Sequence, residues 1–242
     1  MSERATDTAG AAGAIGPRRG RRRAPRTYMS EEDETMPVMH IPGHDHQKPR
    51  EVTLEEIRAV LGDCHLCPLG ETRTNLVFGV GNPHARVMIV GEAPGKNEDL
   101  RGEPFVGAAG HNLDELLSLA GLAREDVYIA NVLKCRPPSN RNPKPEEIQL
   151  CAPFLREQIR SIWPDVIVCL GNFASHFVLR TDMGITSLRG RFHQTGHFAV
   201  LPTFHPAAAL YHREWQPIIE DDFRLLGSWL QSHPADGGEA GA

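Results

Sequence analysis

The sequence predicts an α/β domain in which helices cover both faces of a parallel β-sheet. Short, continuous apolar runs alternate with stretches of helical periodicity, which is typical of parallel strands that are buried on both faces. Polar residues follow three of these runs, at the carboxyl ends where sheets of this class bind ligands. The four predicted strands span residues 86–90, 127–131, 165–170 and 198–203.

The stretches between the strands carry the start and stop signals of helices. The first, at residues 53–62, opens with Thr53 as N-cap and Glu56 three positions later, which is the pattern of a capping box. A second helix shows leucines on one face and stops at Gly121. Later helices are predicted to begin near Pro145 and Gly171 and to run from about Trp215 to Leu230.

Length and composition are those of a globular protein with one domain. The chain has 242 residues, of which 40% are hydrophobic and 24% charged, with a formal net charge of −5. No apolar run reaches the roughly 18 residues of a membrane span, and the N-terminus lacks the apolar core of a secretory signal. We therefore expect a cytoplasmic protein. The negative charge argues against a general nucleic-acid coat but permits a local basic groove.

Composition divides the chain into three parts. Residues 1–50 are rich in Gly, Ala, Pro and charge, and are predicted to form a disordered tail. An arginine block at residues 18–26 precedes an acidic block at residues 31–34, so the tail is either a solvated segment with largely cancelling charges or a weak phosphate tether. Residues 51–232 are the predicted domain, and residues 233–242 are a predicted flexible tail.

Five cysteines indicate metal binding or burial rather than disulfide bonds, because nothing marks the chain for export. Cys64 and Cys67 form a C-x2-C pair. Cys135 and Cys151 follow at scattered positions. A zinc ribbon usually has two such pairs, whereas one tight pair with two scattered thiols suits a [4Fe–4S] cluster, and the spacing alone leaves both metals open. Cys169 lies mid-strand and is predicted to be a core residue.

Polar segments stand at three predicted strand ends. Glu92 follows the first strand, Asn131 closes the second, and His205 follows the fourth. The topology of a parallel sheet brings such segments together at one edge. Taken singly, each has a structural interpretation, since acids cap helices, Asn favours turns and a His before Pro suits a structural hydrogen bond. Phe105 in the loop after the first strand is likewise compatible with a core position.

Three segments of the chain carry a longer pattern: GEAPGKNEDLRGEPFVG, NVLKCRPPSNRNPKPEE and FHPAAAL. Together with the cysteine spacing, they resemble the type-4 uracil-DNA glycosylases of bacteria and archaea over about residues 54–230. The resemblance implies a three-layer α/β/α sandwich around a central, mostly parallel four-stranded sheet. It also implies that a [4Fe–4S] cluster is held by Cys64, Cys67, Cys135 and Cys151.

The resemblance further implies a function. A member of this family is expected to flip uracil out of single- or double-stranded DNA and to hydrolyse its N-glycosidic bond, leaving an abasic site for base excision repair. The expected protein is a monomer that binds uracil-containing DNA and no membrane, and that associates with the nucleoid when acting on DNA. A subgroup that bonds covalently to DNA carries a basic insertion after the second strand, which this chain lacks, so ordinary turnover is expected.

The family pattern also implies roles for residues of this chain. Glu92 is expected near the sugar C1′ and its water, Asn131 at the uracil edge and His205 at the uracil O2, which makes these three the expected catalytic residues. Phe105 would stack on the flipped base, and Glu98 would exclude the 5-methyl group of thymine. The implied substrate-binding residues are Gly91, Ala93, Glu98, Phe105, Asn131 and His205.

Two further segments are implied to contact DNA. The Pro-rich loop from Arg136 to Pro145 would compress the phosphate backbone, and the segment after His205 would probe the minor groove. Several relatives carry a bulky wedge four positions after the motif histidine, where this chain has Ala209 followed by Leu210. The sequence leaves the wedge open between these two residues.

Two other function classes fit parts of the sequence. A non-catalytic, metal-stabilised nucleic-acid-binding module on the same fold needs the cysteines but not Glu92, Asn131 or His205. A Rossmann-like nucleotide-binding enzyme accounts for the GEAPG turn after the first strand, but the turn lacks the G-x-G-x-x-G pattern. Polar residues at three strand ends favour the glycosylase over the non-catalytic module, and the proline of the GEAPG turn disfavours a phosphate-binding loop.

Overall fold

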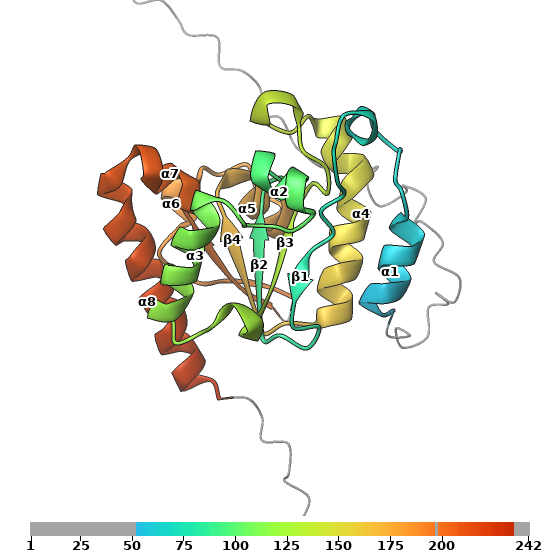
Figure 1. The fold of residues 1–242 in the computed structure, drawn as a ribbon. Helices are drawn as coiled ribbons and strands as arrows, with labels where there is room; N and C mark the ends of the chain where they lie inside the picture. The colour runs from blue at the N-terminus through green and yellow to red at the C-terminus, as the bar shows by residue number, and fades with distance from the viewer. Residues whose placement is uncertain (1–51, 197, 235–242) are drawn as a thin grey trace, which may run out of the picture.

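A computed structural model describes residues 52–196 and 198–234, and in this part of the chain helices flank both faces of a single sheet (Figure 1). The predicted tail at residues 1–50 lies outside the described residues, as do residues 235–242. No helix of the described part is both long and apolar enough to cross a membrane.

Six strands of the described residues form the sheet, in the order β1-β3-β2-β4-β6-β5. Their bounds are β1 (Val80–Gly81), β2 (Val87–Gly91), β3 (Val127–Asn131), β4 (Val166–Leu170), β5 (His193–Thr195) and β6 (Phe198–Thr203). The four central strands, β3, β2, β4 and β6, run parallel, which confirms the four strands predicted from the sequence.

The two edge strands were not predicted. β1 pairs antiparallel with β3, and β5 pairs antiparallel with β6, so the sheet is mixed and larger than the four strands expected. β1 has two residues and β5 has three, and neither carries the apolar run that marks a buried strand. Short edge strands of this kind limit pairing with the edges of other chains.

The helices are α1 (Leu54–Leu61), α2 (Lys96–Arg101), α3 (Ala108–Leu119), α4 (Pro145–Ile162), α5 (Asn172–Leu179), α6 (Ile185–Leu188), α7 (Pro206–Tyr211) and α8 (Gln216–Ser232). Single 3₁₀ turns are η2 (Pro68–Glu71), η3 (Arg124–Asp126), η4 (Pro138–Asn140) and η5 (Arg213–Trp215). The predicted capping box is confirmed at α1, where Thr53 Oγ1 accepts from the Glu56 amide and the Thr53 amide donates to Glu56 Oε2.

The layers follow from the alternation of side chains along the central strands. Along β2, Val87 and Ile89 pack toward α3 and α8, whereas Met88 and Val90 pack toward α4 and α5. α1 packs on α4, on the side away from the sheet (Figure 1). All five residues of β2 are buried, as a strand covered on both faces requires. The predicted α/β/α sandwich is therefore confirmed.

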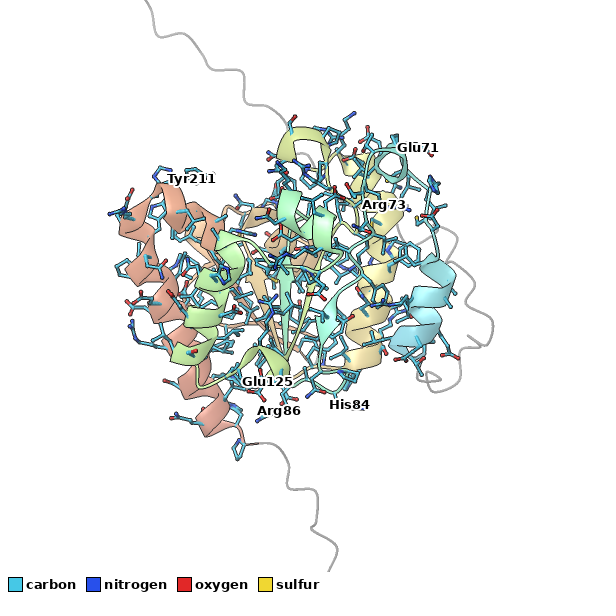
Figure 2. All side chains as sticks on the ribbon, viewed as in Figure 1. Glu71, Arg73, His84, Arg86, Glu125 and Tyr211 are labelled. Atoms are coloured by element: carbon cyan, nitrogen blue, oxygen red, sulfur yellow. The ribbon has the colours of Figure 1, made fainter. Side chains whose placement is uncertain are left out.

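The strand register brings the predicted functional segments to one edge of the sheet. Gly91 at the end of β2 pairs with Asn131 at the end of β3, and Leu170 at the end of β4 pairs with Thr203 near His205. The loops that follow these strands therefore open on the same side, beside α2. Figure 2 shows Tyr211 toward this upper edge and Arg86, which precedes β2, toward the opposite one.

Candidate active site

A pocket opens at the carboxyl ends of β2, β3 and β6. Its volume is about 880 Å³, including the part open to solvent. It is lined by residues from four segments: Glu92, Ala93, Pro94, Gly95, Glu98, Phe105, Ala109, Asn131, Pro137, Asn140, Arg141, His205 and Ala207. All the side chains expected at the uracil from the sequence line this one pocket, and Gly91 lies directly beneath it.

Asn131 has the most unusual hydrogen-bonding state in the pocket. Its side chain is 2% exposed, yet its Oδ1 is the one buried side-chain nitrogen or oxygen among residues 52–196 and 198–234 that has no hydrogen-bond partner. Buried polar atoms are normally paired, because an unpaired one costs about 1–3 kcal/mol. Asn131 therefore keeps an unused acceptor at the wall of the pocket.

Gly91 makes room for this arrangement. A Cβ atom at Gly91 would overlap Asn131 Oδ1 and would lie 2.8 Å from Phe105 Cζ. The amide oxygen and the aromatic ring are therefore both packed over the bare backbone of Gly91. Gly91 shapes the pocket from below instead of contributing a side chain to it.

Phe105 is held in a backbone conformation that side chains rarely adopt, with a φ of 53°. Two groups fix this turn. Arg124 donates to the carbonyl oxygens of Pro104 at 2.7 Å and of Phe105 at 2.9 Å. Glu98 Oε1 accepts from the next two backbone amides, Val106 at 2.9 Å and Gly107 at 3.0 Å. Strain that is held this firmly is common at binding sites.

His205 stacks on Phe105, with ring centroids 5.5 Å apart and an interplanar angle of 21°. Its Nδ1 accepts a hydrogen bond from the Ala207 amide at 3.1 Å, so in the neutral ring the proton resides on Nε2. Burial lowers the pKa of His205 to about 4, against the opposing effect of Glu98. The imidazole is therefore neutral at neutral pH and offers Nε2–H as a donor.

Glu92 is the second titratable side chain of the pocket whose pKa is strongly shifted by its surroundings. Burial raises the pKa of its carboxyl group to about 7. Its backbone carbonyl accepts from the Leu133 amide at 3.0 Å, which continues the ladder between β2 and β3 and fixes the residue at the pocket floor. A carboxyl group with a pKa near 7 is suited to acid–base chemistry at neutral pH.

The Pro-rich loop forms the rim of the pocket. Ser139 and Asn140 both have positive φ, at 55° and 53°, and the guanidinium of Arg141 forms two hydrogen bonds with Glu147 on α4. The family resemblance implied that this loop contacts DNA, but the sequence did not indicate the Arg141–Glu147 pair. The role of Arg124 was missed as well, because its partners are backbone carbonyls about 20 positions away in sequence.

The segment after His205 forms α7, and the two wedge candidates on it differ in exposure. Ala209 is 6% exposed and packs in the core beneath the helix. Leu210 is 49% exposed and Tyr211, at the end of the helix, is 84% exposed. Figure 2 shows Tyr211 at the surface. Ala209 therefore has no side chain available to enter DNA, whereas Leu210 does.

A second, nearly filled cavity lies where the loop before η2, the loop after β3 and α4 meet. Its lining includes four cysteines together with apolar side chains: Leu61, Cys64, Leu66, Cys67, Leu69, Leu76, Leu133, Lys134, Cys135, Leu150 and Cys151. The fifth cysteine, Cys169, is fully buried in the core on β4, as predicted. No three His, Cys, Asp or Glu side chains in the described part of the chain are grouped closely enough to hold a single metal ion.

Two donors point at sulfur atoms of the cysteine cavity. Arg73 Nη1 lies 3.4 Å from Cys135 Sγ, and the Lys134 amide lies 3.3 Å from Cys151 Sγ. Burial raises the pKa of the Cys151 thiol to about 12, while Lys134 acts to lower it. Thiolates in so buried a place require positive charge beside them. The donor set of four thiols, with cations close by, fits an iron–sulfur cluster.

Comparison with known proteins agrees with this geometry. The sequence profile of the Uracil DNA glycosylase superfamily matches residues 78–225. A type-4 uracil-DNA glycosylase of Archaeoglobus fulgidus is 46% identical over 183 residues, which cover 72% of this chain and 92% of that protein. One of Thermotoga maritima is 47% identical over 186 residues, covering 75% and 97%. A type-5 uracil-DNA glycosylase of Pyrobaculum aerophilum is 35% identical over 145 residues, covering 52% and 63%.

Proposed function

The chain belongs to the uracil-DNA glycosylase superfamily and within it to the type-4 uracil-DNA glycosylases, and from this membership we propose how its residues perform the reaction. The protein is a DNA-repair hydrolase that removes uracil from DNA. Its similarity to glycosylases along most of its length excludes the non-catalytic module and the nucleotide-binding enzyme as descriptions of the chain.

The observation that carries the proposal is the unpartnered oxygen of Asn131. Uracil presents a donor at N3 and an acceptor at O4, and a side-chain amide meets both when its oxygen accepts and its NH2 donates. Cytosine presents the reverse order, so that like groups would face each other in the pocket. Sites built to pair with a polar edge reject the mismatched analogue by roughly 10⁴-fold, because buried groups are left unpaired.

We propose that Phe105 binds the face of the flipped base and that His205 binds its O2 atom. The ring of Phe105 offers a stacking surface, which offsets part of the few kcal/mol that base flipping costs. Cleavage of the N-glycosidic bond leaves negative charge on uracil, and the Nε2–H of neutral His205 donates to the base O2 where that charge develops. Removing one donor of this kind typically costs about 10²–10³ in rate.

We propose different tasks for the two pocket carboxylates. Glu92 in its ionised form orients the attacking water or offsets the positive character that develops on the sugar. Glu98 is engaged with the amides of Val106 and Gly107, so it holds the turn that presents Phe105 and forms a fixed wall beside the base. A wall at that place excludes the 5-methyl group of thymine. Ala93 and Gly91 complete the floor.

We propose that the thiolates of Cys64, Cys67, Cys135 and Cys151 hold a [4Fe–4S] cluster. The support is that four thiols line one cavity and that Arg73 and the Lys134 amide donate toward two of the sulfur atoms, Cys135 Sγ and Cys151 Sγ. When bound, the cluster would supply structural cross-links between the loop before η2, the loop after β3 and α4. The proposed chemistry on the base belongs to the pocket residues alone.

We also propose how the chain meets DNA. The loop from Arg136 to Pro145 binds phosphates at the pocket rim, and Leu210 enters the space that the flipped base leaves in single- or double-stranded DNA. One chain contains the whole pocket, so a monomer suffices. The place of action we propose is the cytoplasm, at the nucleoid.

The test is excision from an oligonucleotide with one uracil, followed by alkali to cleave abasic sites. The wild-type protein should cut at uracil and leave cytosine and thymine intact. Asn131→Asp and Asn131→Ala should each lower the single-turnover rate by at least about 10²-fold. If both variants excise uracil at near wild-type rates, Asn131 does not read the base and the proposed pocket assignment is wrong.

A further inference from the structure

Lys134 is a fully buried lysine that the proposed chemistry does not use. Its side chain is 0% exposed, and it lies three residues after Asn131 and one before Cys135. A buried ammonium group is costly unless it is paired and hydrogen-bonded, whereas an apolar side chain of similar length carries no such cost. A lysine at this place therefore requires specific partners.

The partners of Lys134 lie at the end of β3 and on α4. Its Nζ donates to the backbone oxygen of Asn131 at 2.8 Å and to Gln158 Oε1 at 2.6 Å. Gln158 is itself fully buried and is fixed by a second bond, since its Nε2 donates to the Phe78 carbonyl at 2.9 Å. The ammonium thus ties the Asn131 peptide to a side chain that cannot move freely.

The main chain of Lys134 is fixed as firmly as its side chain. Its amide points at Cys151 Sγ at 3.3 Å, and its carbonyl oxygen accepts from the Val77 amide at 2.8 Å. The residue therefore stands between the uracil pocket and the cysteine cavity, with its side chain turned back toward Asn131. Asn131 Oδ1 has no hydrogen-bond partner. Apart from the hydrogen bonds of the strand, Asn131 is therefore held mainly by the bond from Lys134 Nζ to its backbone oxygen.

We propose that Lys134 is a positioning residue for base recognition: its buried ammonium group fixes the Asn131 peptide so that the amide side chain stands ready for the uracil edge. The inference rests on the proposed role of Asn131 as the residue that reads the base. A shift of about 1 Å in a positioned group can lower a reaction rate by about 10²-fold. Loss of the hydrogen bond from Lys134 to the Asn131 backbone should therefore lower the excision rate measurably.

The test is a double-mutant cycle between Lys134→Met and Asn131→Ala, read as single-turnover uracil excision by the iron-loaded protein at saturating enzyme. Lys134→Met alone should lower the rate by about 10- to 100-fold. In the Asn131→Ala background it should change the rate less than about 2-fold, because the group it positions is gone. Damage to the fold or to the cysteine cavity would instead lower the rate equally in both backgrounds.

Two further variants keep the test decisive. Cys169→Ala, a core change outside both sites, should leave the rate unchanged in both backgrounds. If Lys134→Met does not retain iron, Gln158→Met removes the other acceptor of the ammonium group, further from the cysteines, and should show the same coupling to Asn131→Ala. Equal losses in both backgrounds overturn the role of Lys134 alone. A wild-type rate for Asn131→Ala overturns the proposed role of Asn131 and, with it, this inference.

Discussion

Single residues in the pocket are constrained by close contacts as much as by polarity. Gly91 carries no side chain because Asn131 Oδ1 and the Phe105 ring occupy the space above it. Phe105 keeps a positive φ because Arg124 and Glu98 hold the peptides on either side. The Asn131 amide, the Phe105 ring and Gly91 therefore form one packed unit, in which a change at one position displaces the others.

Gly91→Ala tests this unit. The added methyl group should push the Asn131 amide and the Phe105 ring out of place, and single-turnover excision of uracil should fall by about 10²-fold. Gly184→Ala is the matched control, because a Cβ there meets no atom within 4 Å and φ is −68°. Equal activity of the two variants would show that the pocket tolerates a methyl group at Gly91.

The proposed role of Glu92 predicts a pH dependence of the reaction. Because burial raises its pKa to about 7, the Glu92 carboxylate is incompletely formed at neutral pH. The single-turnover rate should rise with pH through a midpoint near 7 and level off above it. Glu92→Gln should be far slower and should lack this step. A wild-type rate that is flat across that pH range would contradict the assignment of Glu92 as the working carboxylate.

The raised pKa of Glu92 makes the stability of the fold decrease with rising pH, whereas the reaction rate is expected to increase. The folded protein binds the Glu92 proton more tightly than the unfolded chain, where the pKa is 4.5, so stability falls as the pH rises from about 4.5 through 7. Glu92→Gln has no charge to bury. Its thermal midpoint should therefore exceed that of the wild type above pH 7 and match it at the acid end of this range.

At the scale of elements, the pocket is assembled by segments that reach across the strand ends. Arg124 on η3 clamps the loop before α3 and also pairs with Asp114 on α3 at 2.8 Å. Asn112 on α3 donates to the Pro206 carbonyl and thereby fixes the start of α7, where His205 is the N-cap. Helix α3 thus joins the turn at Phe105 to His205, whose ring stacks on that of Phe105.

Arg124→Met removes the clamp while keeping the aliphatic stem. The turn at Phe105 should relax from its positive φ, and uracil excision should slow by about 10-fold. Arg224→Met on α8 is the control, since its guanidinium pairs only with the surface acids Glu220 and Asp221 among the contacts seen. If the two variants lose activity to the same extent, Arg124 does not position Phe105.

The four cysteines of the second cavity come from the loop before η2, the loop after β3 and α4. A cluster bound to them should therefore affect both the colour and the stability of the purified protein. We expect a brown protein with iron and labile sulfide. Cys64→Ser should lose iron and lower the thermal midpoint, whereas Cys169→Ser should retain the colour because that residue lies in the core of β4. A colourless wild-type protein that contains zinc would show that the cluster assignment is wrong.

At the scale of the whole molecule, the residues found to line the pocket and the cysteine cavity belong to the described part of the chain, and the sequence of residues 1–45 carries no apolar pattern and none of the expected site residues. Deleting residues 1–45 should therefore leave single-turnover excision unchanged. The arginine block at residues 18–26 should add affinity for DNA only at low salt, which a comparison of binding at two salt concentrations would detect. Loss of activity at saturating enzyme would place part of the site in that segment.

Local patterns were sufficient to predict much of this protein. The apolar runs predicted β2, β3, β4 and β6, because a strand buried on both faces must be apolar throughout. The capping box predicted the start of α1, and the motifs predicted that Glu92, Asn131 and His205 would face one pocket. These features depend on residues close in sequence or on a rule of sheet topology, so the chain alone determined them.

Tertiary structure decided what depends on contacts between distant segments. The edge strands β1 and β5 exist because neighbouring strands offer free backbone groups, and their own residues carry no strand pattern. The burial of Ala209, the clamp of Arg124 and the hold of Lys134 on Asn131 likewise arise from packing partners that no local pattern reveals. The raised pKa of Glu92 has the same origin, because desolvation is a property of the folded surroundings rather than of the residue.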